Sequence, residues 1–220
     1  MIKIINLSIK CEKNFIFKKL NFLIKKKTYV IIGNNGIGKS TLLKSFIKDE
    51  NYSFTGEIFF NKINILMYKT DYISRMGIFY TYQNPIEIYN IKNIFFLKTC
   101  FNIFNLKNVF FFKILNFYIN KIKFKKKLLF RMYNYGFSGG EKKKNEFLFL
   151  LIMNPIFILL DEIDSGLDYN SIFFITNYLN NIKNKKYIII ITHNKSIKNL
   201  LIIDYYLIIK FNQINFLSCI

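Results

Sequence analysis

The sequence predicts an α/β fold with a mainly parallel sheet. Short apolar runs alternate with longer mixed segments along the 220 residues, a pattern typical of strands joined by helices. The runs Ile156–Leu160 and Tyr187–Ile191 are almost wholly apolar, as expected for strands buried on both faces of a parallel sheet. Seven of the nine glycines lie at 33–38, 136–140 and 166, where the backbone takes positive φ or approaches something closely. These three segments are candidate binding loops.

We expect one domain over residues 1–220, because the chain is long enough to bury a large core. The apolar runs and their flanking residues place the remaining elements. Strands are predicted at Ile2–Ile9, Tyr29–Ile32, Glu57–Phe60 and Ile78–Tyr82, closing edge strands at Asp204–Ile209 and Ile214–Leu217, and helices at Ser40–Ile47 and Gly139–Leu151.

The stretch from about Ile86 to Tyr135 differs from the rest of the chain. It is rich in Phe, Asn and Lys, and it contains no glycine before Gly136. We therefore predict an inserted helical subdomain over about residues 86–150. The lysine run Lys121–Lys127 is expected to be a solvated helix face rather than a binding patch.

The net charge of +20 has two explanations. The chain has no Ala or Trp and only two Arg, and it is dominated by Phe, Ile, Asn, Lys and Tyr. Because AT-rich codons encode these residues, genome composition is the preferred explanation, and we expect no nucleic-acid partner. A nucleic-acid or other anionic partner is the alternative, since a charge of this size normally indicates one.

Cysteine usage and hydropathy limit the class of protein further. Cys11, Cys100 and Cys219 lie far apart, so we expect neither a disulfide framework nor a metal site built on cysteine. No run reaches about 18 uncharged apolar residues, the length that a membrane span requires, so we expect no direct membrane insertion. No targeting pattern precedes the first strand. The expected location is the cytoplasm, or the stroma of a plastid-type organelle for an organelle gene.

The first glycine segment fits the phosphate-binding pattern G-x-x-x-x-G-K-[ST] between a strand and a helix. Its backbone N–H groups are expected to surround phosphate oxygens, and the helix N-terminus adds partial positive charge. Lys39 would reach the β- and γ-phosphates of ATP, and the Ser40 hydroxyl would bind Mg²⁺. The segment consists of Gly33, Asn34, Asn35, Gly36, Ile37, Gly38, Lys39, Ser40 and Thr41.

Two carboxylates follow the apolar strand Phe157–Leu160. Open α/β sheets bind their ligands at the carboxyl ends of the strands, so Asp161 and Glu162 would lie beside the phosphate loop. Asp161 is predicted to hold Mg²⁺ through water. Glu162 is predicted to polarise the attacking water as a general base.

The segment Phe137-Ser138-Gly139-Gly140-Glu141 resembles the signature motif of ABC-type ATPases. Ser138 is a good helix N-cap, and the two glycines expose backbone donors at a helix start that favours an anion. The resemblance implies that Ser138, Gly139, Gly140 and Glu141 bind the γ-phosphate held by a second copy of the chain. It also implies a core built around the phosphate loop, an antiparallel β part and the inserted helical subdomain.

Three shorter matches to the same family follow the expected order. Gln83 corresponds to the Q-loop glutamine, which the resemblance makes a sensor of Mg²⁺ and a link to the helical region. Asp164-Ser165-Gly166-Leu167-Asp168 corresponds to the D-loop. His193, the only histidine, corresponds to the switch histidine at the γ-phosphate. A lone histidine is more often structural, but this one follows a predicted strand.

Details of these segments resemble the SufC family, the ATPases of the SUF iron–sulfur cluster assembly system. The features are Gly136-Phe137-Ser138-Gly139-Gly140-Glu141-Lys142-Lys143-Lys144-Asn145-Glu146, Asp164-Ser165-Gly166-Leu167-Asp168 and Gln83-Asn84-Pro85-Ile86-Glu87-Ile88. The resemblance implies a SufB and/or SufD scaffold as partner. SufC proteins usually continue with a helical tail, which this sequence does not show. Phe15 or Phe17 is the candidate for stacking on adenine.

Two other function classes stay open. The ATP-binding subunit of an ABC membrane transporter would dock a membrane subunit on the region from Gln83 to Tyr135, although transporter ATPases usually have Gln after Ser-Gly-Gly and Asp-Glu-Pro-Thr after the second strand. A DNA-repair ATPase would suit the charge, but such proteins carry long coiled coils between the phosphate loop and the Asp161 strand. The interval here is too short for one.

Overall fold

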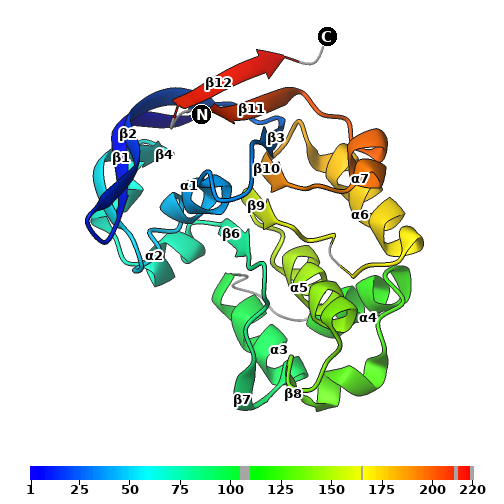
Figure 1. Ribbon diagram of the computed structural model, residues 1–220. Coiled ribbons are helices and arrows are strands. Elements are labelled where there is room, and N and C mark those ends of the chain that lie inside the picture. The colour runs from blue at the N-terminus through cyan, green and yellow to red at the C-terminus, as the bar shows by residue number, and fades with distance from the viewer. Residues whose placement is uncertain (105–109, 165, 211–212, 219–220) are drawn as a thin grey trace.

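A computed structural model describes residues 1–104, 110–164, 166–210 and 213–218. It confirms the α/β fold. Its centre is a six-stranded sheet in the order β12-β11-β3-β10-β9-β6 (Figure 1), in which all neighbours are parallel except β11 and β12. The strands are β3 (Thr28–Ile32), β6 (Ile78–Thr81), β9 (Phe157–Asp161), β10 (Tyr187–Ile191), β11 (Tyr205–Lys210) and β12 (Gln213–Ser218).

Strand β9 shows how this sheet divides the core into two layers. All five of its residues are buried, and successive side chains of a strand point to opposite faces. Phe157 and Leu159 belong to one apolar cluster, whereas Ile158 and Leu160 belong to the other. The sheet is therefore covered on both sides, as its apolar sequence requires.

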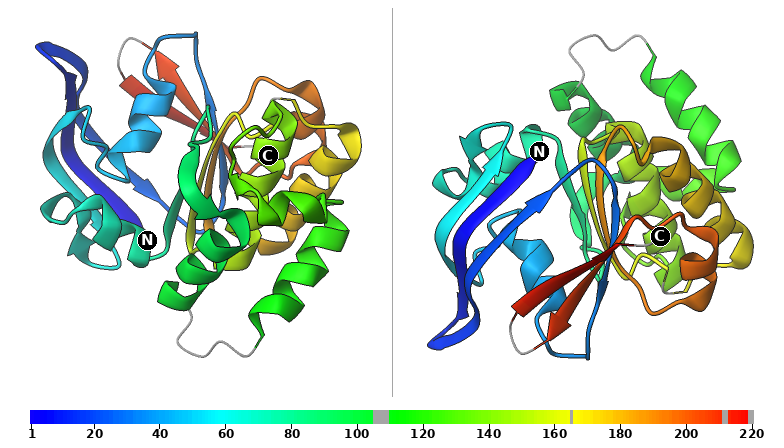
Figure 2. Two further views of the ribbon diagram at one scale, coloured as in Figure 1. Left: turned by 90° about the horizontal axis from the view of Figure 1, so that it is seen from below. Right: turned by 90° about the horizontal axis from the view of Figure 1, so that it is seen from above.

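The first face packs against α1 and an antiparallel sheet in the order β2-β1-β4-β5. Helix α1 lies between the two sheets in both views (Figures 1 and 2). Short helical turns then lead into β6. The elements on this side are β1 (Ile2–Cys11), β2 (Asn14–Ile24), α1 (Lys39–Ser45), β4 (Ser53–Phe60), β5 (Ile63–Asn64), η1 (Ile65–Met67) and α2 (Thr70–Arg75).

The second face packs against α5, α6 and α7. Helices α3 and α4 pack on α5 farther from the sheet, and α3 also contacts the small ribbon β7-β8 (Figure 1). The elements from β7 to α5 lie almost wholly within residues 86–150, the span for which an inserted helical subdomain is predicted, whereas α6 and α7 lie outside it. The elements on this side are β7 (Ile88–Lys92), α3 (Asn93–Phe104), α4 (Phe111–Lys121), η2 (Lys126–Phe130), β8 (Met132–Tyr133), α5 (Gly139–Met153), α6 (Tyr169–Ile182) and α7 (Lys195–Leu200).

The structure corrects two details of the sequence interpretation. Asp204–Ile209 is not an edge, because β11 pairs with β3 on one side and β12 on the other. Ile156 is 42% exposed and lies before β9, so the buried strand begins one residue later than predicted. The ribbon β7-β8 was not expected within the helical region, and β2, α6 and α7 were also not predicted.

We expect Phe157→Ala to lower the free energy of unfolding by about 3–5 kcal/mol, the range for truncation of a buried phenylalanine. The Phe157 ring is fully buried and contacts the rings of Phe46, Phe60 and Tyr187. The control is Phe95→Ala, since Phe95 is 60% exposed and its loss should change stability by less than about 0.5 kcal/mol. Urea denaturation measures both, and equal effects would contradict this description of the core.

Candidate active site

The phosphate-loop sequence connects β3 to α1. Gly38 has φ +100°, and a Cβ atom there would lie 2.7 Å from Ile16 Cγ2 and 2.9 Å from Phe17 Cε2. The position therefore needs glycine both for its backbone conformation and for its close packing on β2. This packing brings Ile16 to the loop and fixes where α1 begins.

A cavity of about 660 Å³ lies over this loop and brings five separate segments together. Gln83 comes from the end of β6, Glu162 from the end of β9 and His193 from the end of β10. The carboxyl ends of three neighbouring parallel strands thus meet at the phosphate loop, as expected for an open α/β sheet. The lining residues are Ile16, Asn35, Gly36, Gly38, Lys39, Ser40, Thr41, Gln83, Glu162 and His193.

Lys39 is 8% exposed and folds back on its own loop. Its Nζ donates to the carbonyl oxygens of Gly33 and Asn34, at 2.7 and 3.1 Å, and to Asn35 Oδ1 at 3.5 Å. Burial lowers the pKa of Lys39, while the carboxylates of Glu162 and Asp161 act in the opposite direction. The ammonium group is thus preorganised inside the loop, where phosphate oxygens would add to its contacts.

Asp161 has the chemistry of a cation ligand. It is 1% exposed, and its Oδ2 accepts a hydrogen bond from the Tyr80 hydroxyl at 2.8 Å. Its Oδ1 is buried without a hydrogen-bond partner, although buried carboxylate oxygens normally have one. This orphaned oxygen, together with the Ser40 hydroxyl and the Gln83 amide at the neighbouring cavity, fits Mg²⁺, a hard cation that prefers oxygen ligands.

Glu162 lies where the chain bends away from β9. Its φ is +50°, a left-handed conformation that is uncommon for residues other than glycine. Gln83 Nε2 donates to Glu162 Oε2 at 2.9 Å, and His193 Nε2 lies 4.0 Å from Glu162 Oε1. The three residues predicted for catalysis are therefore neighbours at the mouth of the cavity.

The signature segment forms a capped helix start. Ser138 Oγ accepts from the Glu141 N–H at 3.3 Å, and Glu141 Oε2 accepts from the Ser138 N–H at 3.0 Å, which is a capping box. Lys125 Nζ donates to Glu141 Oε1 at 2.7 Å and lowers the pKa of that carboxyl to about 2. A Cβ on Gly140 would lie 2.5 Å from the Gly166 carbonyl oxygen, so the D-loop packs directly on the signature.

Ser138, Gly140 and Glu141 line a second cavity, of about 240 Å³, together with Gly166 and Asp168. None of these five residues lines the phosphate-loop cavity among the residues described. The structure therefore does not bring the predicted signature donors to the chain's own phosphate loop. Ser165 of the D-loop and Cys219 lie outside the described residues.

The residues after the signature were not predicted to have separate roles, yet their side chains join the surrounding loops to α5. Lys142 pairs with Glu87 at 2.5 Å, and Lys144 pairs with Asp168 at 2.7 Å. Asn145 continues the network by bonding to the side chains of both Asn93 and Asn134. The run of charged and amide side chains at 141–146 is the sequence feature that indicates these contacts, because so many polar groups at a helix start need hydrogen-bond partners.

Lys143 and Glu146 both contact the main chain of Tyr82, the residue before Gln83. Lys143 Nζ donates to the Tyr82 carbonyl at 2.7 Å, and Glu146 Oε1 accepts from the Tyr82 N–H at 2.8 Å. Burial raises the pKa of Glu146 to about 7, with Lys143 partly opposing it. The position of the Q-loop is thus set by α5.

Of the two candidates for stacking on adenine, one is exposed and the other is buried. Phe17 is fully buried beneath Gly38. Phe15 is 40% exposed, and its ring has the ammonium groups of Lys10 and Lys18 at 4.2 and 4.9 Å from its centroid. The residue between them, Ile16, is the one that lines the phosphate-loop cavity.

Comparison with known proteins agrees with this geometry. The family model described as ABC transporter matches residues 17–165, so the chain belongs to the ABC transporter family and is an ATP-binding, ABC-type ATPase. It is 35% identical over 93% of its length to the probable ATP-dependent transporter ycf16 of Cyanophora paradoxa, covering 83% of that protein. It is 36% identical over 90% of its length to a probable ABC transporter ATP-binding protein of Streptococcus pyogenes, covering 81% of it.

Solved structures support the fold. The chain is similar to the ATP-binding subunit of an ABC transporter, with a TM-score of 0.85, 20% identity, and coverage of 99% of this chain and 90% of that one. It is also similar to a dimeric bacterial ABC transporter cassette, with a TM-score of 0.81, 18% identity, and coverage of 99% and 98%. In the described part of the chain, no helix has both the length and the apolar character needed to cross a membrane.

We expect Lys39→Ala to abolish measurable ATP binding, because the charge-assisted contacts of an ammonium group to phosphate are roughly twice as strong as neutral hydrogen bonds. The fold should persist. The matched control is Lys44→Ala on the same helix, whose ammonium faces Asp49 and Tyr52 instead. Calorimetric titration with ATP measures both variants, and unchanged affinity in Lys39→Ala would remove the phosphate-loop assignment.

Glu162→Gln should still bind ATP but hydrolyse it about 10²–10⁴-fold more slowly, which is the usual contribution of a general base. The amide keeps the size of the side chain but cannot accept the proton of the attacking water. Single-turnover hydrolysis alongside ATP affinity separates the two effects. A normal rate in this variant would mean that another group activates the water.

Proposed function

We propose that this chain is the ATP-hydrolysing subunit of a SUF-type iron–sulfur cluster assembly complex. ATP binding would pair two copies of the chain, and the pairing would change the shape of a SufB and/or SufD scaffold on which the cluster is built. Hydrolysis would then release the pair.

The observation that carries this proposal is the direct pairing of the three SufC-like segments. Lys142 of the signature helix bonds to Glu87, which is the glutamate of Gln83-Asn84-Pro85-Ile86-Glu87-Ile88. Lys144 of the same helix bonds to Asp168, the last residue of the D-loop match. Features that separate the SufC family from transporter ATPases in sequence thus form one connected unit here.

Each residue of the site has a role in the proposed reaction. Bound Mg²⁺ would neutralise charge on the phosphates, held through Ser40, Asp161 and Gln83. Lys39 and the loop amides would orient the β- and γ-phosphates. Glu162 would accept the proton of the attacking water, and His193 beside it would contact the γ-phosphate.

A second copy of the chain would complete the site. The signature donors line a cavity separate from the phosphate loop, and the N–H groups of Gly139 and Gly140 lie at a helix start, where an anion is favoured. The Lys125–Glu141 ion pair and the capping box hold this helix start in one geometry. The γ-phosphate held by the opposite copy would bind to this preformed helix start.

The ATP-binding subunit of an ABC membrane transporter is the second candidate function. It is supported by the names of the curated relatives, which are a probable ATP-dependent transporter and a probable ABC transporter ATP-binding protein. In that case the partner would be an integral membrane protein.

Affinity purification of the tagged chain from its source tests the choice of partner. We expect scaffold proteins of the SufB or SufD type to co-purify. The Lys39→Ala variant is the control for partners that bind only in the ATP-bound state. Recovery of an integral membrane protein, with no SUF scaffold, would contradict the proposal and support the transporter function.

Mixing two inactive variants tests the shared site. Lys39→Ala lacks the phosphate contact but keeps the signature, and Ser138→Arg has the opposite defect. A mixed dimer contains one intact composite site, so we expect the mixture to recover part of the wild-type ATPase rate. If crosslinking shows mixed dimers and no activity returns, the shared-site proposal is wrong.

A further inference from the structure

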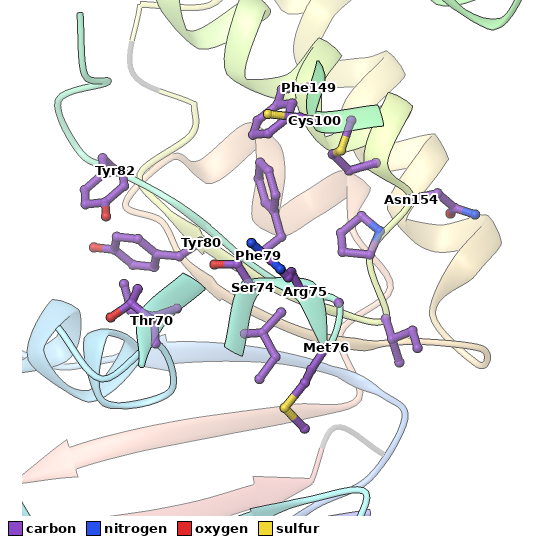
Figure 3. Close-up of a pocket in the computed structure, with 16 residues that line it drawn as sticks. Thr70, Ser74, Arg75, Met76, Phe79, Tyr80, Tyr82, Cys100, Phe149 and Asn154 are labelled. Carbon is purple, nitrogen blue, oxygen red and sulfur yellow. The ribbon is translucent and has the colours of Figure 1, made fainter. Parts of the chain in front are cut away.

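A groove of about 510 Å³ surrounds the free edge of β6. Figure 3 shows the Tyr80 and Tyr82 side chains next to each other on one wall, with Phe149 and Cys100 at another and Met76 below. The two tyrosine rings meet edge to face, with centroids 4.9 Å apart. The groove lies outside the phosphate-loop cavity, but one of its side chains reaches the active site.

That side chain is Tyr80. Its ring forms part of the groove wall, while its hydroxyl donates to Asp161 Oδ2 at 2.8 Å. Tyr80 is 9% exposed and Asp161 1%, so water has little access to compete for this hydrogen bond. A tyrosine hydroxyl keeps its proton at neutral pH and is therefore a permanent donor to the carboxylate.

The next residue of β6 holds Asp161 from its main chain. Thr81 Oγ1 accepts from the Asp161 N–H at 2.9 Å and donates to the Leu159 carbonyl at 3.5 Å. Adjacent residues of one strand thus fix both the backbone and one carboxylate oxygen of Asp161. Of the two carboxylate oxygens, Oδ1 is left without a hydrogen-bond partner, and Tyr80 restricts the rotation of the carboxylate.

We propose that Tyr80 is a positioning residue for the metal: by binding Oδ2 it fixes the carboxylate of Asp161 so that Oδ1 faces Mg²⁺. The inference rests on the proposed role of Asp161 toward Mg²⁺. A residue that hydrogen-bonds to a metal ligand restricts the orientation of that ligand and raises the affinity for the metal. The ring of Tyr80 also makes it a physical link between the groove and the metal site.

Tyr80→Phe tests the proposal, because it removes the hydroxyl and keeps the ring in the groove. Mn²⁺ is the probe, followed by electron paramagnetic resonance in the presence of ADP. We expect the apparent Mn²⁺ affinity to fall about 10-fold, the lower end of the range for such partners. ADP affinity measured in EDTA should stay at the wild-type value, since the phosphate loop is untouched.

Tyr82→Phe is the matched control, since it removes the hydroxyl of the neighbouring ring on the same wall. We expect wild-type Mn²⁺ affinity in this variant. Thermal unfolding of both variants shows whether each is folded at the temperature of the titration. If Tyr80→Phe is unstable, Thr81→Val supplies a second probe of how Asp161 is held. This change keeps the shape of the side chain but removes the hydroxyl that accepts from the Asp161 N–H, so it should also weaken Mn²⁺ binding.

Three results would overturn the proposal. The first is that a folded Tyr80→Phe variant binds Mn²⁺ as tightly as the wild type. The second is that Tyr82→Phe loses as much Mn²⁺ affinity as Tyr80→Phe. The third is an equal loss of ADP affinity in EDTA, which would show a general disturbance of the site. If the wild-type protein with ADP binds no Mn²⁺ at all, the metal role of Asp161 fails together with this inference, whereas the ATP-binding assignment is tested separately by Lys39→Ala.

Discussion

Lys143 and Glu146 of α5 contact the carbonyl and the N–H of Tyr82, and the arrangement of the active site depends on these two hydrogen bonds. The residue that follows, Gln83, donates to Glu162, so the start of α5 holds the main chain immediately before a residue that contacts Glu162. Lys144 extends the same control to the D-loop through Asp168. One helix therefore contacts both the Q-loop, beside the phosphate-loop cavity, and the D-loop, beside the second cavity.

Burying these polar groups has a free-energy cost that the apolar packing around them must offset. Lys143 is 2% exposed and Glu146 5%, and desolvation of such a pair can exceed its attraction. The hydrogen bonds to Tyr82 and the amide network of Asn93, Asn134 and Asn145 supply further contacts. A buried network of this kind holds its members in one geometry, which suits loops that must present ligands to phosphate at fixed distances.

Sequence spacing was sufficient to predict the parts of the site that lie within one short segment of the chain. The phosphate loop and the pair Asp161 and Glu162 follow strands directly, so their place at the sheet edge follows from chain order. Strand β2 was not predicted, because bulges interrupt its pairing with β1 and two adjacent lysines obscure its alternation. Helix α6 was not predicted because it is rich in Asn and β-branched residues, which have low helix propensity.

Which side chains pair between distant segments could not be predicted in the same way. Lys125 lies in the run Lys121–Lys127, for which a solvated helix face is predicted. Its lysines are exposed, but α4 ends at Lys121, so the run is not one helix face, and the ammonium of Lys125 binds Glu141. Nothing in the local pattern distinguishes it from Lys126 or Lys127. Likewise, the alternation of β6 shows that Tyr80 points into the core but not that its hydroxyl meets Asp161. Such pairings depend on how distant segments pack.

The left-handed backbone at Glu162 has a consequence for how this protein can change. A side chain other than glycine in this conformation costs roughly 1–2 kcal/mol, and glycine or asparagine would relieve that strain. Selection for thermal stability alone would therefore favour replacing the residue proposed as the general base. Glu162 is thus a position where stability and turnover are in conflict, and a stabilised variant found by unbiased screening could be an ATP-binding protein that no longer completes its cycle.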